Sequence, residues 1–206
     1  MGESQPRKAK RWPDGWHTRG YLPHFDGGEI PQFVTFRLFD SLPQSVLARW
    51  RQELAQENES QRASALRRRA EAYLDSGYGA CYLKDARVAT LVQDALLFHH
   101  GAKYTLAAWV VMPNHVHLLA TPRAGHELSG IMHSLKSYTA SEANKILSRQ
   151  GRFWQKESFD RYIRDAKHFH SVVAYIENNP VKAGLCEKPE GWPYGSAYFR
   201  ARSPEI

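Results

Sequence analysis

The sequence predicts an α+β fold of the ferredoxin or RRM type, in which helices pack on an antiparallel sheet. Strand-like segments, two of them joined by a short Pro-Asn turn, are separated by stretches whose apolar residues repeat at helical spacing. The expected order is strand, one or two helices, hairpin, helix, strand and helix. That order favours one antiparallel sheet covered by helices over a repeated parallel unit.

Four segments are predicted as strands. Residues 32–39 alternate and are rich in β-branched and aromatic side chains. Residues 104–112 and 115–121 flank the Pro-Asn turn and are expected to form an antiparallel hairpin. Residues 159–164 are predicted as a further short strand.

The first helical region begins at a predicted capping box formed by Ser41 to Gln44. A polar stretch, residues 56–62, is expected to interrupt it before the apolar spacing resumes. Gly77 and Gly79 are expected to end it.

Three more helices follow in the prediction. Asp85 caps the first of them, which Gly101 closes. Residues 127–148 form the next. Residues 165–179 form the last, and Pro180 is expected to stop it.

Composition is typical of a folded, basic protein. The chain has 206 residues, 42% of them hydrophobic, with a formal charge of +7 and a pI of about 9.5. A basic surface favours polyanions, so nucleic acid is the first partner to consider and an anionic membrane the second. Only Cys81 and Cys186 occur, which excludes a disulfide scaffold and a cysteine-built zinc site and suits a reducing cytoplasm.

The chain is expected to form one domain, residues 32–200, with a helical insertion at about 56–80. Residues 1–31, rich in Pro, Gly, basic and aromatic side chains, are expected to be an extended arm, and residues 201–206 a tail. No apolar run approaches the roughly 20 residues that cross a bilayer, and no secretory h-region occurs at the start. No membrane association is therefore expected.

His115 and His117 are two residues apart in a strongly strand-like segment. Side chains at that spacing lie on the same face of a sheet, so both imidazoles are within reach of one metal ion. Removing two histidines on an apolar strand from water also costs free energy unless something is bound to them. The alternative is a pair of histidines on a wet strand face.

Tyr175 and Asn179 are four residues apart on the last predicted helix and share one of its faces. A phenol can attack phosphorus, and an amide oxygen can complete the coordination of a hard metal. A rival pair, Tyr138 and Glu142, has the same spacing on the preceding helix. The residue types and spacings alone do not decide which of the two pairs belongs to the site.

Further candidates lie between residues 145 and 170. His168 and His170 are possible third metal ligands. The stretch also contains seven Lys or Arg against three acids, with aromatic residues between them. Basic groups contact phosphates and aromatics stack on unpaired bases, so this stretch is a candidate single-strand track. The nucleic-acid-binding candidates are Arg152, Trp154, Lys156, Arg161, Arg164 and Lys167.

Three segments, WVVMPNHVHLL (109–119), FWQKESFDRYIRD (153–165) and YIENNPVKAGL (175–185), resemble one known family. It is the REP-associated tyrosine transposases, a branch of the HUH single-strand nucleases related to single-tyrosine insertion-sequence transposases. The resemblance implies that His115, His117 and Asn179 hold a divalent metal ion, Mg²⁺ or Mn²⁺, and that Tyr175 is the catalytic tyrosine. It also implies the ferredoxin-like fold. The 56–80 insertion is longer than in compact members, so no role is implied for it.

The function implied by the resemblance is that of a single-stranded DNA endonuclease and strand transferase that forms a 5′-phosphotyrosine on hairpin or palindromic DNA. A homodimer is compatible with the sequence. Two other functions stay open: a non-catalytic single-strand-binding protein on an RRM-like fold, and a metal-dependent phosphodiesterase that uses water. Only the first function requires a covalent protein–DNA adduct.

Overall fold

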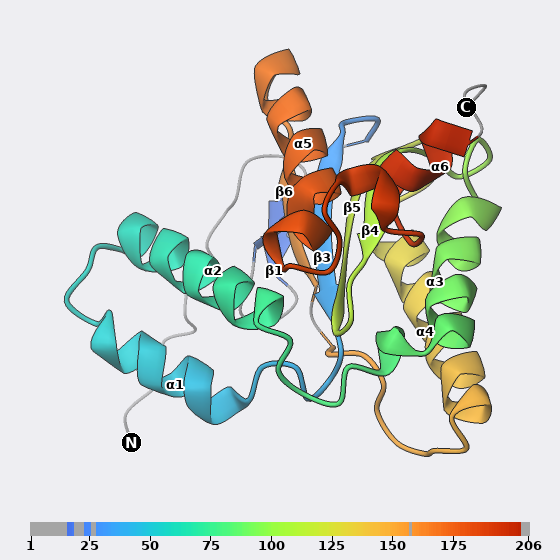
Figure 1. The fold of residues 1–206 in the computed structure, drawn as a ribbon. Coiled ribbons are helices and arrows are strands. Elements are labelled where there is room, and N and C mark those ends of the chain that lie inside the picture. Colours follow the sequence, from blue (N-terminus) through green and yellow to red (C-terminus); the bar gives the residue numbers. More distant parts are fainter. Residues whose placement is uncertain (1–15, 19–22, 26–27, 157, 203–206) are drawn as a thin grey trace, which may run out of the picture.

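The sheet forms the centre of the molecule. A computed structural model describes residues 16–18, 23–25, 28–156 and 158–202. Four antiparallel strands lie in the order β4-β5-β3-β6 (Figure 1): β3 (Gln32–Arg37), β4 (Tyr104–Val111), β5 (His115–Pro122) and β6 (Phe159–Tyr162). The first strand of this sheet therefore lies inside it, between the third and the fourth, as in ferredoxin-like folds. The predicted α+β class is confirmed.

Helices α3 (Ala86–Phe98) and α4 (Leu128–Ile146) cover one face of the sheet. Both present a stripe of apolar residues, as the spacing predicts, and the stripes meet Val34, Phe36 and Leu118 from the strands. Asp85 caps α3 by accepting a hydrogen bond from the Arg87 amide at 3.0 Å, which confirms the predicted cap.

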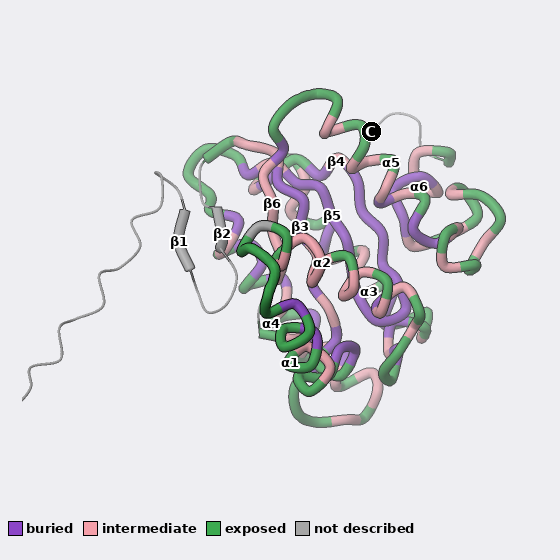
Figure 2. Tube along the Cα trace, turned by 90° about the vertical axis from the view of Figure 1, so that its left-hand side faces the viewer, coloured by how far each residue is buried: buried purple, intermediate pink, exposed green. Residues whose placement is uncertain are grey.

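Helix α5 (Ala166–Lys182) covers the other face. Its Ile176 packs with Phe33 and Leu119 of the strands and with Ile163, which follows β6. Figure 2 shows the result: β3, β4 and β5 are buried along most of their length, while exposed residues lie on the surrounding helices and loops. Residues that alternate along β5 thus belong to two separate apolar clusters.

Two helices connect β3 to α3. The expected interruption is present at residues 54–58, whereas residues 59–62 of the predicted break belong to the second helix. The two helices are α1 (Gln44–Glu53) and α2 (Glu59–Asp75), and Asn58 caps α2 by accepting from the Gln61 amide. The expected capping box at Ser41 is wrong. Its hydroxyl donates to the Leu38 carbonyl at 2.8 Å, and Pro43 is the N-cap residue of α1 without a side-chain hydrogen bond.

Pro180 does not stop α5, which continues to Lys182. Proline removes one amide donor, but the turn is held by the Ala183 amide, which donates to the Asn179 carbonyl at 3.0 Å. Gly184, with a φ of 68°, follows the end of the helix. A last helix, α6 (Ser196–Arg202), was not predicted; its Phe199 packs on Trp109 with ring centroids 5.5 Å apart.

Short elements complete the chain: the 3-10 turns η1 (Tyr82–Lys84) and η2 (Pro189–Gly191), and an antiparallel pair β1 (Trp16–Thr18) and β2 (Pro23–Phe25). Most of the expected arm and residues 203–206 of the expected tail lie outside the described residues. Within the described ranges, no helix has the length and apolar character needed to span a bilayer.

Candidate functional site

Strand β5 places His115 and His117 on the face that α5 covers. On the neighbouring strand β3, Arg37 pairs with His115 and Thr35 pairs with His117. Phe36, which lies between Thr35 and Arg37, belongs to the apolar cluster on the opposite face. Both imidazoles are buried, and their Nε2 atoms lie 3.0 Å apart. The predicted convergence of the two rings is therefore present, but the rings lie inside the protein rather than on a wet strand face.

A second layer of hydrogen bonds orients the two rings. The Asn114 amide nitrogen donates to the carbonyls of Leu74 and Tyr78, so its oxygen faces His115 Nδ1 at 2.7 Å. His115 Nδ1 must then carry the proton, which leaves a lone pair on its Nε2. This arrangement suits a ligand imidazole.

His117 has two possible tautomers, because its Nδ1 lies 2.7 Å from the Thr35 hydroxyl, which can donate or accept. In one tautomer His117 Nε2 donates to His115 Nε2, which satisfies the pair without any ion. In the other, Nδ1 donates to Thr35, and both Nε2 lone pairs are available to a cation. Thr35 can support either state by rotating its hydroxyl.

Burial keeps both histidines neutral. Burial, with a smaller contribution from the positive charge of Lys182, lowers the pKa of His115 to about 3. Burial, the neighbouring His115 and Lys182 lower the pKa of His117 well below its ordinary value. Neutral imidazole is the form that binds metals, so neither ring needs to lose a proton to ligate one at neutral pH.

Helix α5 brings Tyr175 and Asn179 to the same place. The Tyr175 ring lies edge-on to both His117, with centroids 5.4 Å apart, and Phe33, at 5.8 Å. The Tyr175 hydroxyl and both polar atoms of the Asn179 amide are buried without a hydrogen-bond partner. Unpartnered buried polar groups are costly and rare, and they are characteristic of sites that receive a ligand.

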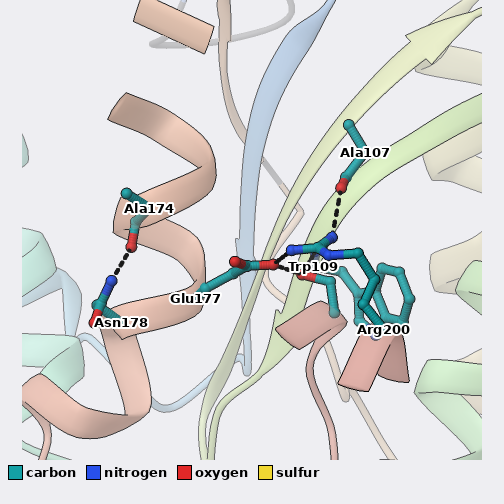
Figure 3. Close-up of polar contacts among 7 residues, drawn as sticks. Ala107, Trp109, Ala174, Glu177, Asn178 and Arg200 are labelled. Atoms are coloured by element: carbon teal, nitrogen blue, oxygen red, sulfur yellow. Dashed lines mark hydrogen bonds and ion pairs between the residues drawn. The ribbon is translucent and has the colours of Figure 1, made fainter. Parts of the chain in front are cut away.

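The α5 helix is held in register by a polar network on its other side. Glu177 accepts hydrogen bonds from the Ser196 hydroxyl at 2.6 Å and from the Arg200 guanidinium, which also donates to the Ala107 carbonyl (Figure 3). Figure 3 shows the Glu177 side chain reaching from α5 toward Arg200, so α6 ties α5 to β4. The network fixes the helix that carries Tyr175.

Helix α2 adds charged groups beside the same site. Lys182 of α5 pairs with Asp75 of α2, with Nζ and Oδ2 2.6 Å apart. Burial raises the pKa of Tyr175, and the negative charges of Glu71 and Asp75 raise it further. The Tyr175 phenol is therefore protonated at neutral pH in the free protein.

The rival pair lies elsewhere. Tyr138 is 55% exposed on α4, which covers the sheet face opposite to the histidines. Glu142 forms an ion pair with Lys145 at 2.6 Å. The structure thus brings Tyr175, and not Tyr138, to the two histidines.

The additional histidine candidates are at the other end of α5. His168 Nδ1 accepts a hydrogen bond from the Arg164 amide at 3.3 Å, and His170 is exposed on the helix. Within the described ranges, no three His, Cys, Asp or Glu side chains are arranged to hold a metal ion. A metal held by the two site histidines would therefore need a ligand of another type, such as the Asn179 amide.

The nucleic-acid-binding candidates lie in different environments. Arg152, Lys156, Arg164 and Lys167 are exposed, and Arg161 is half-buried on β6. Trp154 differs from the expected surface aromatic. It is buried, its indole donates to the Thr139 hydroxyl at 2.9 Å, and it packs edge-on to Phe36. The ring forms part of the core because a bridge pairs Trp154 with Leu38 beyond the end of β3.

Several residues at the site are not predicted by the sequence. Asn114 directly precedes the histidines, so its position was a signal that could have been used. Thr35 reaches His117 through strand pairing across 82 residues, and Glu71 and Asp75 approach from a separate helix. None of these three carries a local signal, because only the tertiary fold brings them to the site.

Thr35→Val tests the orienting role of the Thr35 hydroxyl. Valine has a similar shape but cannot form a hydrogen bond with His117 Nδ1, so the ring loses the partner that orients it. Loss of such an outer-shell partner typically costs 10–100-fold, and we expect a drop of about that size in Mn²⁺ affinity. Titration calorimetry measures it, with Thr105→Val on β4 as the control. Equal Mn²⁺ affinity of Thr35→Val and wild type would exclude the role.

Comparison with known proteins identifies relatives of this chain. Residues 95–179 match the family model described as IS200-like transposases. The chain is 30% identical over 94 residues to the REP-associated tyrosine transposase of Escherichia coli (strain K12), covering 45% of this chain and 54% of that protein. It is 28% identical over 113 residues to a putative REP-associated tyrosine transposase of Haemophilus influenzae, covering 50% and 64%. The match therefore spans less than two thirds of either relative.

A solved structure supports the fold. The structure of a REP-associated tyrosine transposase bound to a REP hairpin superimposes with a TM-score of 0.55, over 90% of this chain and 87% of that one. At 18% identity, this likeness establishes the fold alone. The family resemblance of the three sequence blocks is confirmed by the family model and by the two relatives from Escherichia coli and Haemophilus influenzae.

Proposed function

We propose that this chain, whose residues 95–179 match the IS200-like transposase model, is a member of that family and a metal-dependent single-stranded DNA endonuclease and strand transferase with Tyr175 as its nucleophile. The observation that carries the proposal is the unpartnered Tyr175 hydroxyl beside two neutral, buried histidines and an unpartnered Asn179 amide. A transposase needs a group that stores the phosphodiester energy between cutting and rejoining. A tyrosine in this position supplies one.

The reaction is a transesterification. The Tyr175 oxygen forms a bond to the scissile phosphorus as the bond from phosphorus to the 3′ oxygen breaks. The products are a 5′-phosphotyrosine and a free 3′-hydroxyl, which takes up a proton. Attack of a 3′-hydroxyl on the phosphotyrosine reverses the step and rejoins strands, so no nucleotide cofactor is required.

The residues present fit a divalent metal ion. His115 and His117 would offer their Nε2 atoms, and Asn179 its amide oxygen, which otherwise is buried without a partner. Mg²⁺ or Mn²⁺ bound there would polarise the scissile phosphate and offset its developing charge. The imidazole ligands also suit Zn²⁺ or Ni²⁺, so the choice of metal is not fixed by the residues.

The protonated phenol sets a further requirement on the reaction. Because burial raises the pKa of Tyr175, and Glu71 and Asp75 add to it, attack must be accompanied by departure of the phenolic proton. The positive charge of Arg67 favours the charged form of the phenol. Binding of a cation at the site would act in the same direction.

The proposed substrate is hairpin or palindromic single-stranded DNA. Both relatives are named for REP elements, and the related structure holds a REP hairpin. The decisive experiment incubates the protein and Mn²⁺ with end-labelled hairpin DNA that has single-stranded flanks, and resolves the products on a denaturing gel. A labelled band at the mass of the protein–DNA adduct supports the proposal. Cleaved DNA without adduct would favour a water-using phosphodiesterase, and binding without cleavage a non-catalytic protein.

Replacing Arg152 and Lys156 together by alanine tests whether the exposed part of the 145–170 stretch contacts phosphates. Each single-strand phosphate contact contributes roughly 0.7 to the slope of log affinity against log salt. The double variant should therefore show a slope shallower by about 1.4 if both residues touch phosphate. Replacing Lys103 and Lys188 by alanine is the charge-matched control, because both lie outside the stretch. A slope equal to that of wild type would place the DNA elsewhere.

A further inference from the structure

A cavity of about 490 Å³ lies on the sheet face opposite to the histidines. It is bounded by α4 and by residues 151–156 and 158, and Val34 and Asp160, which pair across β3 and β6, contribute to its wall. Thr35, the next residue on β3, points to the other face and contacts His117. The cavity is thus separated from Tyr175 by the sheet, and its volume is in the range of small-ligand sites, about 300–1,000 Å³.

The wall of the cavity is fixed in the free protein. Lys136 of α4 donates from Nζ to the carbonyls of Gln155 and Lys156, at 2.7 and 2.9 Å, and to the Ser158 hydroxyl at 3.2 Å. These bonds hold the loop before β6 against the helix. A ligand would therefore meet a site that needs little ordering on binding.

The lining combines an apolar interior with cations. Val34, Met132 and Phe153 supply apolar surface, while Arg152 and Lys156 are exposed at the rim. The Arg152 guanidinium also lies over the ring of Phe39, 5.4 Å from its centroid, and Phe39 is 44% exposed. A nucleotide has the matching chemistry, with an apolar base face to bury and a phosphate for the cations.

We infer that this cavity binds one unpaired nucleotide of the DNA strand, with its base between α4 and the 151–156 segment and its phosphate at Arg152 and Lys156. The inference rests on the proposed function, because it takes the ligand to be the DNA that Tyr175 cleaves. The strand would pass from one face to the other near β6, the edge strand of the sheet, beside which β2 also lies. Arg161, which pairs with Phe33 on the histidine face of β6, lies beside that route.

Filling the cavity tests the inference. Ser137 of α4 lines it, whereas Ser134 is equally exposed on the same helix but does not. Phenylalanine at position 137 should occupy the space of the base and weaken binding about tenfold or more, the size of one lost base-stacking contact. Ser134→Phe should bind within about twofold of wild type. Fluorescence anisotropy in EDTA, with a labelled hairpin carrying single-stranded flanks, measures both while the DNA stays intact.

Two further measurements make the test specific. Wild type and Ser137→Phe should bind a hairpin with abasic flanks equally, because such flanks carry no base that the phenylalanine could exclude from the cavity. With 5-iodouracil in the flanks, photocrosslinks to wild type should map to peptides containing Met132 or Phe153, a result independent of how the variant folds. Equal affinity of both phenylalanine variants for the intact flanks, crosslinks only elsewhere, or no binding by wild type would overturn the inference.

The outcome is separable from that of the proposed function. The covalent adduct is scored in Mn²⁺ on a denaturing gel, whereas the cavity is scored by affinity in EDTA. Loss of the adduct with a persisting Ser137→Phe defect would refute the tyrosine chemistry alone. A normal adduct with no Ser137→Phe defect would refute the cavity alone.

Discussion

Tyr175→Phe should abolish cleavage and the covalent adduct while DNA affinity stays within a few-fold of wild type. The substitution removes one oxygen, which has no hydrogen-bond partner among the described residues, and leaves the ring packed against Phe33 and His117. Deleting a covalent nucleophile reduces the rate by roughly 10⁴-fold or more. Single-turnover cleavage of labelled hairpin DNA measures the loss, and anisotropy measures affinity.

The matched control is Tyr138→Phe, which removes a hydroxyl from the exposed tyrosine of α4. It should cleave at the wild-type rate. Full activity of Tyr175→Phe would refute the assignment of Tyr175 as the nucleophile. Loss of activity in Tyr138→Phe would indicate that Tyr138 of α4 is the nucleophile.

His117→Asn should remove the response of the protein to metal. Asparagine places a polar atom near the position of Nδ1, where it can keep the bond to Thr35, but it lacks the Nε2 ligand. For wild type, Mn²⁺ at about 100 times its Kd should stabilise the fold by roughly 2.7 kcal/mol. For a protein of this size, that corresponds to a rise in Tm of roughly 5–10 °C. The variant should show almost none of this rise, and no cleavage.

EDTA should return the Tm of wild type to that of the metal-free protein and stop cleavage. His126→Asn, an exposed histidine outside the site, is the control and should respond to Mn²⁺ as wild type does. Cleavage that persists in EDTA would show that the reaction needs no metal. An unchanged Mn²⁺ response of His117→Asn would place the metal at other residues.

Alanine is a poorer choice at position 117, for a reason that the sequence did not reveal. His117 is stacked on Phe33, with centroids 5.4 Å apart, and contacts Tyr175, so its side chain contributes to packing. Truncation would leave a buried cavity costing roughly 2–5 kcal/mol, and a loss of activity could then reflect unfolding. A sequence shows that two histidines share a strand face but not how deeply that face is covered.

Much of the fold could be predicted because its signals are local. The strand-like composition of 104–112 and 115–121, the turn between them and the Asp85 cap each depend on neighbouring residues, and the predicted strands, turn and cap are present in the structure. The errors occur where a local rule competes with tertiary contacts. Ser41 is a good capping residue, but the extended conformation at Pro43 starts α1 two residues later. Pro180 is tolerated because it lies in the last turn of α5.

The candidate site was predictable in its residue types and spacings but not in its surroundings. A spacing of two residues on a strand places His115 and His117 on one face of the sheet. A spacing of four residues on a helix places Tyr175 and Asn179 on one face of the helix. The structure adds that these two faces meet. The Thr35 contact, the ion pair of Asp75 with Lys182 and the burial of Trp154 join segments far apart in the chain. No spacing rule predicts such contacts.

The most direct test of the proposed tyrosine chemistry is to identify the residue that carries the DNA. Wild-type protein is incubated with Mn²⁺ and hairpin DNA with single-stranded flanks, the adduct is digested with nuclease and protease, and the modified peptide is sequenced by mass spectrometry. We expect a single phosphotyrosyl-nucleotide, on Tyr175, joined through the 5′ phosphate. A modification on Tyr138 or another residue, a 3′ linkage, or cleaved DNA without any modified peptide would contradict it.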